Sequence, residues 1–248
     1  MSATPEDPQK MGHTTATPTT PPNAAAEAAL EFVRDGMRLG LGTGRAAAAF
    51  VDALGRRVAA GLRVTGVPTS DATAAQATRL GIPLARLDEV PRLDITFDGA
   101  DEVDRNLDLI KGYGAAMVRE KIVALSSDQL VILVGPEKLV EKLGERGRLP
   151  IEVLPFGVAL IRRELARLGV EGDLRPDAKG DPLVTDNGNW IFDAQLRPPL
   201  DARALEAAIC ALPGVLGTGF FLGLADAVIV GSGDAVEVRR RAPGAQAR

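Results

Sequence analysis

Histidine is almost missing from this chain of 248 residues, because the only one is His13. His13 lies in residues 1–22, a stretch rich in threonine and proline that is too polar to build a core. Any enzymatic chemistry must therefore use acids and bases other than imidazole. Ser-His-Asp and Cys-His mechanisms are excluded on this ground, and so are metal sites rich in histidine.

Cysteine is equally scarce, since Cys210 is the only one. A single cysteine excludes an internal disulfide and fits a reducing compartment, so we expect a cytoplasmic protein. Cys210 lies at helical spacing with Ile209 and Leu212, which predicts a buried thiol with a structural role. No signal-peptide pattern and no apolar run of membrane-spanning length is present, so we expect no association with a membrane.

Basic residues are not in excess. The chain has 29 lysine and arginine residues against 33 aspartate and glutamate residues, a net charge of -4, so nucleic acid is not an expected partner. Its apolar share of 46% and charged share of 25% are typical of a globular protein. The length allows one large domain or two modest ones.

Strand-like and helix-like segments alternate in the first part of the chain. Apolar runs at residues 37–41, 62–67, 93–97 and 129–135 end in turns, and helix-like segments follow the turns, among them residues 112–126. A shorter strand is expected at residues 82–87. This alternation predicts an α/β fold with a doubly wound, mostly parallel, Rossmann-like sheet.

The pattern changes near Leu149. The run LPIEVLPF carries two prolines, which suits a sheet edge or a crossing between domains. A helix, a hairpin around residues 186–189 and another helix are predicted next, so we expect a smaller inserted α+β, ferredoxin-like domain over residues 149–219. The run LADAVIVGSG is typical of one more parallel strand, which returns the chain to a first domain of residues 23–148 and 220–240. Residues 1–22 and 241–248 are expected to be disordered or frayed tails.

Four turns rich in glycine or acidic residues follow predicted strands, at residues 42–44, 69–71, 98–101 and 135–138. In a parallel sheet these turns meet at one edge, where ligands of open α/β sheets bind. Glycine and aspartate are also common in ordinary turns, so a purely structural role stays open for each turn alone. The run GLGTGRA is only a weak match to a dinucleotide fingerprint and more generally indicates a helix N-terminus suited to an anion such as phosphate.

The stretch from Asp98 to Lys121 concentrates the chemistry. Asp98 and Asp101 follow a predicted strand, Lys111 begins a glycine-rich turn, and Glu120 lies on the helix after it. Carboxylates and a lysine at a strand tip indicate proton transfer on a small polar substrate. From the pattern alone, capping of a helix remains open for the aspartates and a solvated position for Glu120.

The chain resembles the A-type ribose-5-phosphate isomerases. The resemblance rests on motifs that occur in order over residues 24–231: GLGTG, PTSDAT, DGADEVD with NLDLIKG, GAAMVREKIVA, EKLVEKLG, LPIEVLPF, VTDNGNWIFD and LPGVLGTGFF. It implies interconversion of D-ribose 5-phosphate and D-ribulose 5-phosphate in the pentose phosphate pathway, without a metal or an organic cofactor. It also implies an α/β sheet domain with a small inserted domain, assembled as a homodimer or homotetramer.

The resemblance assigns roles by position. Glu120 matches the base that forms the enediol, Asp98 the group implicated in ring opening, and Asp101 and Lys111 the groups that hold the sugar hydroxyls and the enediolate oxygen. A glutamate suits proton transfer when partial burial raises its pKa toward the working pH. The other expected substrate-binding residues are Thr43, Gly44, Arg45, Ala46, Gly99, Ala100, Gly112, Tyr113, Gly114 and Lys138.

Three departures from the family pattern concern the substrate. The family usually reads TGST where this chain has residues 43–46, often carries a basic residue where it has residues 21–23, and usually has glycine at Tyr113. Our hypothesis is that Arg45 supplies the phosphate charge, since a guanidinium can grip phosphate through two bonds. The bulk of Tyr113 either narrows the pocket or turns outward.

Two other functions can be weighed against the isomerase. A non-catalytic sugar-phosphate-binding effector domain of a transcription regulator would need a helix-turn-helix segment, and residues 1–23 are too short and too rich in proline to supply one. A nucleotide-binding oxidoreductase would need an acidic residue after the second strand, where the chain has Pro68, Thr69 and Ser70 instead.

Overall fold

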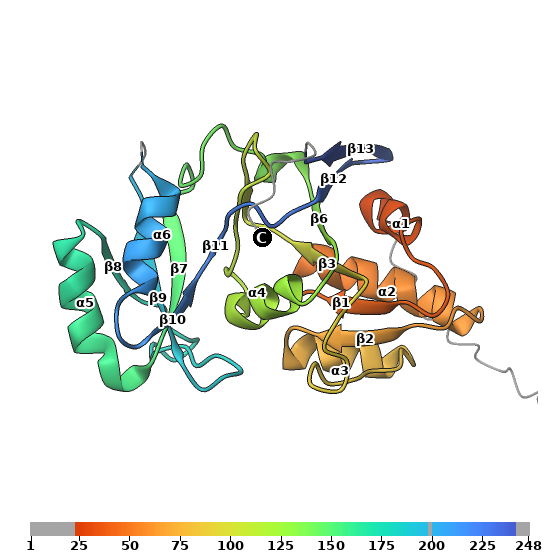
Figure 1. The fold of residues 1–248 in the computed structure, drawn as a ribbon, viewed down its shortest axis with the longest axis horizontal. Helices are drawn as coiled ribbons and strands as arrows, with labels where there is room; N and C mark the ends of the chain where they lie inside the picture. The colour runs from red at the N-terminus through yellow and green to blue at the C-terminus, as the bar shows by residue number, and fades with distance from the viewer. Residues whose placement is uncertain (1–22, 198–199, 242–248) are drawn as a thin grey trace, which may run out of the picture.

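The larger of two lobes is built on a six-stranded sheet. The computed structural model describes residues 23–197 and 200–241, with the larger lobe on the right of Figure 1. The strand order is β13-β12-β6-β3-β1-β2, and all neighbours are parallel except β13 on β12. The predicted doubly wound sheet is confirmed, and so is the return of the chain to it. The strands are β1 (Arg38–Leu41), β2 (Thr65–Pro68), β3 (Ile95–Gly99), β6 (Leu130–Val134), β12 (Ala227–Ser232) and β13 (Ala235–Arg240).

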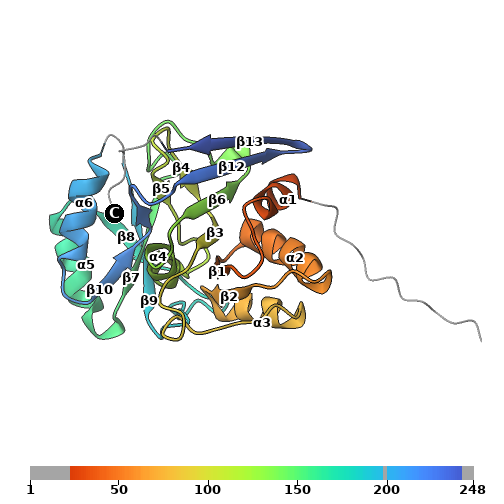
Figure 2. The ribbon, with the colours of Figure 1, turned by 45° about the vertical axis from the view of Figure 1, so that its right-hand side comes forward.

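Helices cover both faces of this sheet, as Figure 2 shows. Helices α1 (Ala24–Leu30), α2 (Arg45–Ala59) and α3 (Asp71–Arg79) lie on one face, and α4 (Met117–Leu125) lies on the other. Strand β6 illustrates the result: Val131 and Leu133 belong to the apolar cluster under α1 and α2, whereas Ile132 belongs to the cluster under α4. The continuous apolar run of β6 thus reflects burial on both faces.

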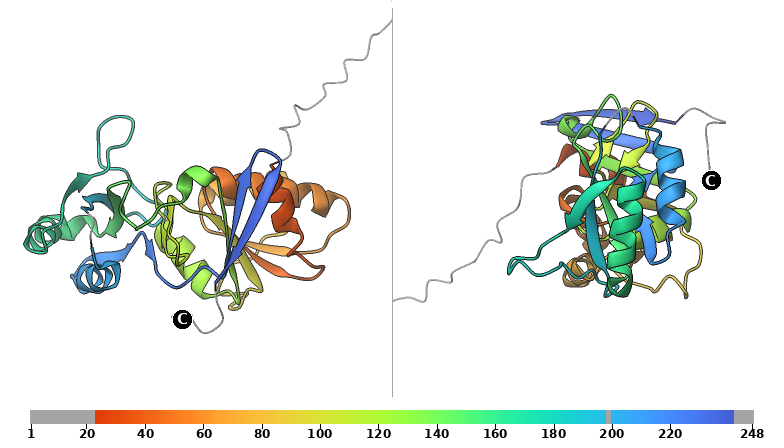
Figure 3. Two further views of the ribbon diagram at one scale, coloured as in Figure 1. Left: turned by 90° about the horizontal axis from the view of Figure 1, so that it is seen from above. Right: turned by 90° about the vertical axis from the view of Figure 1, so that its left-hand side faces the viewer.

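The smaller lobe is an antiparallel sheet with two helices. Its strand order is β10-β7-β9-β8, and α5 (Val158–Arg167) and α6 (Ala202–Cys210) lie next to each other on one face in the right-hand view of Figure 3. This order, with strand–helix–strand–strand–helix–strand succession, is the ferredoxin-like arrangement that we predicted. The strands are β7 (Arg148–Val153), β8 (Glu171–Leu174), β9 (Trp190–Gln195) and β10 (Val215–Thr218).

A third sheet joins the lobes. It consists of β4 (Glu102–Val103), β5 (Leu109–Ile110) and β11 (Phe220–Phe221), with β5 in the middle. Two short 3₁₀ helices, η1 (Pro136–Lys138) and η2 (Pro155–Gly157), follow β6 and β7. Because β5 ends directly before Lys111, this small sheet fixes the chain on the N-terminal side of the Lys111 turn, and α4 follows the turn at Met117.

Of the two positions considered for the proline-bearing run, the sheet edge is wrong, because β7 lies between β10 and β9. A crossing between domains fits, because β7 is the first strand of the smaller lobe. Pro150 lacks an N–H, yet its carbonyl accepts from the Gly219 N–H at 2.7 Å, just beyond the end of β10. The Gly219 carbonyl accepts instead from the Lys111 N–H at 2.8 Å. A Cβ on residue 219 would lie 2.2 Å from the Lys111 oxygen, so this close approach requires glycine.

Several element boundaries also differ from the sequence prediction. The strand expected at residues 82–87 is wrong, since only a single bridge joins Gly66 and Leu84. Helix α4 begins at Met117 rather than at Gly112, because Gly112 and Ala115 have positive φ angles of 104° and 62°. Strands β8 and β13 were not predicted, since both lie at sheet edges and lack buried alternation.

Cys210 is exposed, so the buried thiol expected from the sequence is wrong. Its neighbour Ile209 is fully buried, and the next residue on a helix points about 100° away from it.

The domain boundaries stay predictions. Of the two expected tails, residues 1–22 and 242–248 lie outside the described part. Arg241, the first residue of the expected C-terminal tail, is held by hydrogen bonds that it donates to Ala225 O and Leu107 O, both at 2.8 Å. None of the helices in residues 23–197 and 200–241 is long and apolar enough to cross a membrane.

Candidate active site

A cavity of about 660 Å³ opens at the carboxyl ends of β1, β3 and β6. The chain passes from β1 to β2 on one side of it and then to β3 on the other side, so the direction in which strands are added to the sheet reverses at β1. Such a switch point is where open α/β sheets bind their ligands. The turns after β1, β3 and β6 therefore meet as the sequence predicts, and residues 43–46, 99–101 and 133–135 line the cavity. The fourth turn predicted at this edge, residues 69–71, does not line the cavity, although Thr69 and Ser70 contact the Thr43 hydroxyl.

Three charged side chains are buried together at the base of this cavity. Lys111, Glu120 and Asp98 are 3%, 3% and 1% exposed. The Lys111 ammonium lies 2.9 Å from Asp98 Oδ2 and 3.2 Å from Glu120 Oε2, and it donates to the Gly99 carbonyl at 2.5 Å. The Glu120 oxygen facing Lys111 has no hydrogen bond of good geometry, so it is the least committed oxygen of the group.

Burial sets the protonation of this cluster. The pKa of Glu120 is raised to about 8, chiefly by removal from water and next by the charge of Asp98, against the opposing effect of Lys111. Burial likewise raises the pKa of Asp98, opposed mainly by Lys111. Burial alone would lower the pKa of Lys111, but the two carboxylates outweigh it and raise it. Glu120 thus exchanges its proton close to neutral pH, as a general base should.

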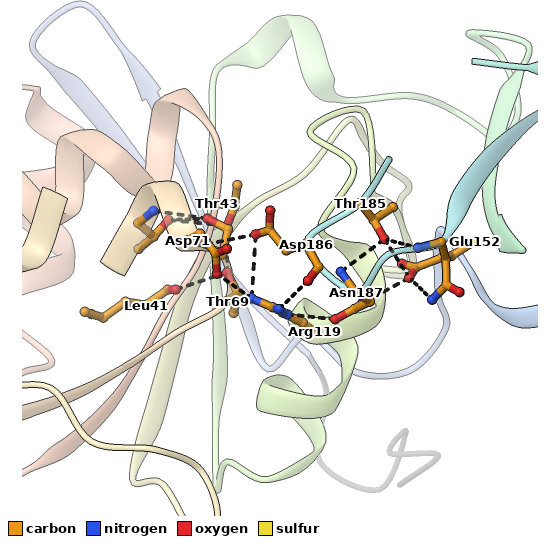
Figure 4. A network of polar contacts seen from close by, with 12 residues as sticks. Leu41, Thr43, Thr69, Asp71, Arg119, Glu152, Thr185, Asp186 and Asn187 are labelled. Atoms are coloured by element: carbon orange, nitrogen blue, oxygen red, sulfur yellow. Dashed lines mark hydrogen bonds and ion pairs between the residues drawn. The ribbon is translucent and has the colours of Figure 1, made fainter. Parts of the chain in front are cut away.

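Asp98 is held by the turn that follows β1. Its Oδ1 accepts from the backbone N–H groups of Gly99 at 2.7 Å and Thr43 at 3.1 Å. The Thr43 hydroxyl contacts the hydroxyls of Thr69 and Ser70, each at 2.8 Å, and part of this network appears in Figure 4. Both Asp98 oxygens therefore have partners, and Asp98 lies behind the cavity lining rather than in it.

The other end of the cavity is suited to an anion. Gly44, with φ at 100°, is the N-cap of the 15-residue helix α2 and gives no side-chain hydrogen bond to the first N–H groups. Arg45 is exposed at the first position of α2, and among the described residues it has no carboxylate partner. A helix N-terminus and a free guanidinium both favour a phosphate. Lys138 also lines the cavity, 4.0 Å from Asp101.

Tyr113 lines the cavity, but its ring is directed toward the smaller lobe. The ring packs with the apolar cluster of that lobe, and the Arg148 guanidinium lies 3.9 Å from its centroid. Its backbone N–H donates to Asp101 Oδ2 at 2.9 Å. The sequence left open whether Tyr113 narrows the pocket or turns outward. The ring turns outward, whereas the backbone of Tyr113 remains at the site.

A second polar cluster ties the smaller lobe to the larger one, as Figure 4 shows. Arg119, next to Glu120 on α4, donates to Asn187 Oδ1 at 2.8 Å and to the Asp186 carbonyl at 2.7 Å, and pairs with Asp71 at 2.9 Å. Asn187 in turn donates to Glu152 Oε1 at 3.0 Å. The loop after β8 is thereby attached to the start of α3 and to α4.

The positions of the predicted residues can be stated plainly. All of the expected catalytic and substrate-binding residues line the cavity except Asp98, which lies directly beneath Lys111. No group of three or more histidine, cysteine, aspartate or glutamate side chains with the arrangement of a metal site occurs within the described ranges. The lining residues that the site prediction missed come from the helix α1 start, from β6 with its following turn and from the β12–β13 turn: Asn23, Ala24, Ala25, Leu133, Val134, Gly135, Glu137, Gly231 and Gly233.

A family profile and curated relatives match most of the chain. The profile described as ribose 5-phosphate isomerase A (phosphoriboisomerase A) matches residues 65–235. The ribose-5-phosphate isomerase A of Bradyrhizobium diazoefficiens is 51% identical over 230 residues, covering 88% of this chain and 95% of that protein. The protein of the same name from Roseiflexus castenholzii is 51% identical over 214 residues, covering 86% and 92%.

Solved structures match the fold equally well. Ribose 5-phosphate isomerase A from Methanocaldococcus jannaschii superposes with a TM-score of 0.83 at 42% identity, covering 88% of this chain and 96% of that one. A D-ribose-5-phosphate isomerase in complex with phospho-erythronic acid gives 0.85 at 41% identity, with the same coverage. These matches confirm the predicted fold and the predicted resemblance.

Proposed function

The chain belongs to the ribose 5-phosphate isomerase A family, and from this premise we propose how its buried carboxylates interconvert D-ribose 5-phosphate and D-ribulose 5-phosphate. It is an aldose–ketose isomerase, and the reaction passes through an enediol. The observation that carries the assignment of roles is Glu120, a buried carboxylate that lines the cavity 3.2 Å from Lys111.

Glu120 is the base of the proposed reaction. Its carboxylate takes the proton from C2 of the open-chain aldose, and the electron pair of the C–H bond forms the C1–C2 double bond while O1 becomes negative. Lys111 stabilises that oxygen, because its ammonium lies where the charge develops. Glu120 then returns its proton to C1. As the C2 carbonyl forms, the proton of the O2 hydroxyl is transferred to O1, which becomes the C1 hydroxyl of the ketose.

The two aspartates have different proposed roles. We assign ring opening to Asp98, whose Oδ2 pairs with the Lys111 ammonium at 2.9 Å, so the sugar must displace or share that contact. Asp101 faces the cavity between Lys138 and the Tyr113 N–H and is placed to accept a sugar hydroxyl. Lys138 and residues 43–46 complete the contacts to the substrate.

Replacement of Glu120 tests the proposal. In the Glu120→Gln enzyme we expect kcat on ribose 5-phosphate to fall by about 10²–10⁴-fold, the usual share of a general base. Exchange of a C2 deuterium with solvent should be lost with it. Wild-type kcat in this variant would remove Glu120 as the base, and a wild-type enzyme without isomerase activity, with or without EDTA, would overturn the function itself.

Arg45 and the N-terminus of α2 form the proposed phosphate site. Loss of a charge-assisted hydrogen bond costs about 1.5–3 kcal/mol, so Arg45→Ala should raise KM about 10- to 100-fold. Arg57→Ala, which removes an exposed arginine at the last turn of the same helix, is the control and should leave KM unchanged. An unchanged KM in Arg45→Ala would contradict the assignment.

We further propose a cytoplasmic homodimer or homotetramer that works in the pentose phosphate pathway. The single cysteine supports a reducing compartment. Apolar side chains in η2 and directly before it support assembly, since Phe156 is 97% and Leu154 44% exposed. Light scattering on the purified protein tests the assembly, and a monomeric mass would contradict it. The effector and oxidoreductase alternatives are not favoured, because the acid–base set and the comparisons both point to the isomerase.

A further inference from the structure

The turn that carries Lys111 is held from the smaller lobe. Arg175, directly after β8, donates through Nη1 to the carbonyls of Gly112 at 3.1 Å and Tyr113 at 3.0 Å. These are the two residues that follow Lys111 in the chain. Gly112 has a positive φ of 104°, so the turn has a backbone conformation that its own sequence only weakly dictates.

Arg175 is itself fixed in place. It is 9% exposed, and its guanidinium makes a two-point ion pair with Asp193 on β9, with Nε at 2.9 Å from Oδ2 and Nη2 at 2.5 Å from Oδ1. Its backbone N–H donates to Ile191 O and its carbonyl accepts from Leu183 N–H, both at 2.8 Å. A planar guanidinium held on one side by a carboxylate presents its remaining donors in a fixed direction.

Arg148 provides a comparison within the same group of side chains. It also pairs with Asp193, at 3.6 Å, and its guanidinium stacks on the Tyr113 ring. Its contact with Tyr113 is therefore with the side chain, whereas Arg175 binds the backbone of the turn. Only the backbone contact constrains where the Lys111 side chain starts.

We propose that Arg175 is a positioning residue for Lys111, which sets the place of the lysine ammonium between Asp98 and Glu120 from the smaller lobe. The inference rests on the proposed function of Lys111. This role would give the inserted domain a part in catalysis, because both members of the Arg175–Asp193 ion pair belong to that domain.

The test is Arg175→Lys, which keeps the charge but cannot hold Asp193 and both carbonyls with one nitrogen. A displacement of about 1 Å in an active site can cost up to about 100-fold, so we expect kcat to fall about 10- to 100-fold with KM changed less than about threefold. Arg148→Lys is the matched control, and we expect it to keep kcat within about threefold.

The pH profile separates positioning from a general loss of structure. Glu120 is faced by Lys111, Asp98 and Asp101, and Lys111 is the only one of these that opposes the rise of its pKa. If Lys111 moves away in Arg175→Lys, the midpoint of kcat/KM against pH moves to higher pH. A smaller folded fraction would lower kcat/KM equally at every pH and leave the midpoint in place.

The outcomes are distinct. Equal kcat and equal midpoints in Arg175→Lys and the wild type would overturn the inference, whereas an inactive wild-type enzyme would overturn the proposed function instead. Where Arg175→Lys fails to fold, Asp193→Asn loosens the same guanidinium while preserving shape. An unshifted midpoint and wild-type kcat in that variant would likewise overturn the inference.

Discussion

Glu120 and Glu152 are both almost completely buried, yet their surroundings differ in kind. Glu120 in the larger lobe and Glu152 in the smaller one are 3% and 0% exposed, and each has an Oε2 atom without a hydrogen bond of good geometry. Glu152 Oε1 accepts from three neutral donors, the hydroxyl of Thr185 at 3.1 Å and the amides of Asn187 at 3.0 Å and Asn189 at 2.9 Å. Glu120 instead has the charges of Lys111 and Asp98 beside it and a cavity before it.

The difference shows that burial alone does not make a catalytic base. A base needs a pKa near the working pH and a free lone pair that a substrate can reach. Glu120 has both. Glu152 does not line the cavity, and its carboxylate accepts hydrogen bonds from residues of a single loop. We therefore expect Glu120 to govern turnover and Glu152 to govern stability.

Turnover should give the largest contrast between the two. Glu152→Gln keeps an acceptor oxygen for the loop, so we expect kcat within about threefold of wild type, against the loss of about 10²–10⁴-fold in Glu120→Gln. Both variants are compared in the same coupled assay on ribose 5-phosphate. A loss of similar size in Glu152→Gln would end the distinction between the two residues.

The pH dependence of kcat/KM should be the next largest effect. Glu120 must be ionised to take a proton, and its pKa is raised to about 8, so kcat/KM should rise through a midpoint near that pH. Below the midpoint the rate should fall about tenfold for each pH unit. Glu152→Gln should leave the midpoint unchanged, and a midpoint near the ordinary glutamate pKa in the wild type would contradict the arrangement.

For the free energy of unfolding, we expect Glu152 to matter more than Glu120. Glu152→Ala leaves three donors without their acceptor, among them the buried Thr185 hydroxyl, and we expect the free energy of unfolding to drop by about 1–3 kcal/mol. Glu141→Ala, which removes a surface carboxylate that is 65% exposed, should change it by less than about 0.5 kcal/mol. Chemical denaturation measures both, and equal effects would show that the loop does not depend on Glu152.

A smaller effect concerns stability against pH. The pKa of Glu120 rises from 4.5 to about 8 on folding, so the folded state binds a proton that the unfolded state releases. The resulting stabilisation is complete below pH 4.5 and is lost as the pH rises toward 8. Relative to Glu120→Gln, the wild type should therefore lose stability between pH 5 and pH 8. Parallel stability curves for the two proteins would refute the raised pKa.

The sequence predicted those parts that leave a periodic or positional signal. The apolar run of β6 and the turns after β1 and β3 predicted the sheet and the edge where Glu120, Lys111 and Asp101 meet. The same patterns failed where exposure removes the signal, as in the edge strands β8 and β13. The fully buried Ile209 was predicted to share its side of the helix with Cys210, which is exposed, because spacing alone does not fix which residues of a short helix face the core.

The supporting contacts of the site could not be predicted from the sequence. Arg175 and Arg119 read as ordinary surface arginines, since the partners that each contacts in the other lobe lie 62 to 68 positions away and depend on how the lobes pack. Pro150 was misinterpreted for a related reason. A proline suggests a sheet edge because it has no N–H to donate to a neighbouring strand. Here the Gly219 carbonyl beside Pro150 accepts from the Lys111 N–H instead, a contact that only the tertiary structure shows.

The bond between Lys111 and Gly219 also has a consequence for the order of folding. Strands β1, β2, β3 and β6 are complete once residue 134 has been synthesised, but the Lys111 turn needs partners that the chain supplies only at Arg175 and Gly219. Contacts of such long sequence separation form late, because the intervening loop must first be closed. On the ribosome, these four strands can thus pair well before the Lys111 turn is held in place, and we expect the site to be complete no earlier than the emergence of residue 219.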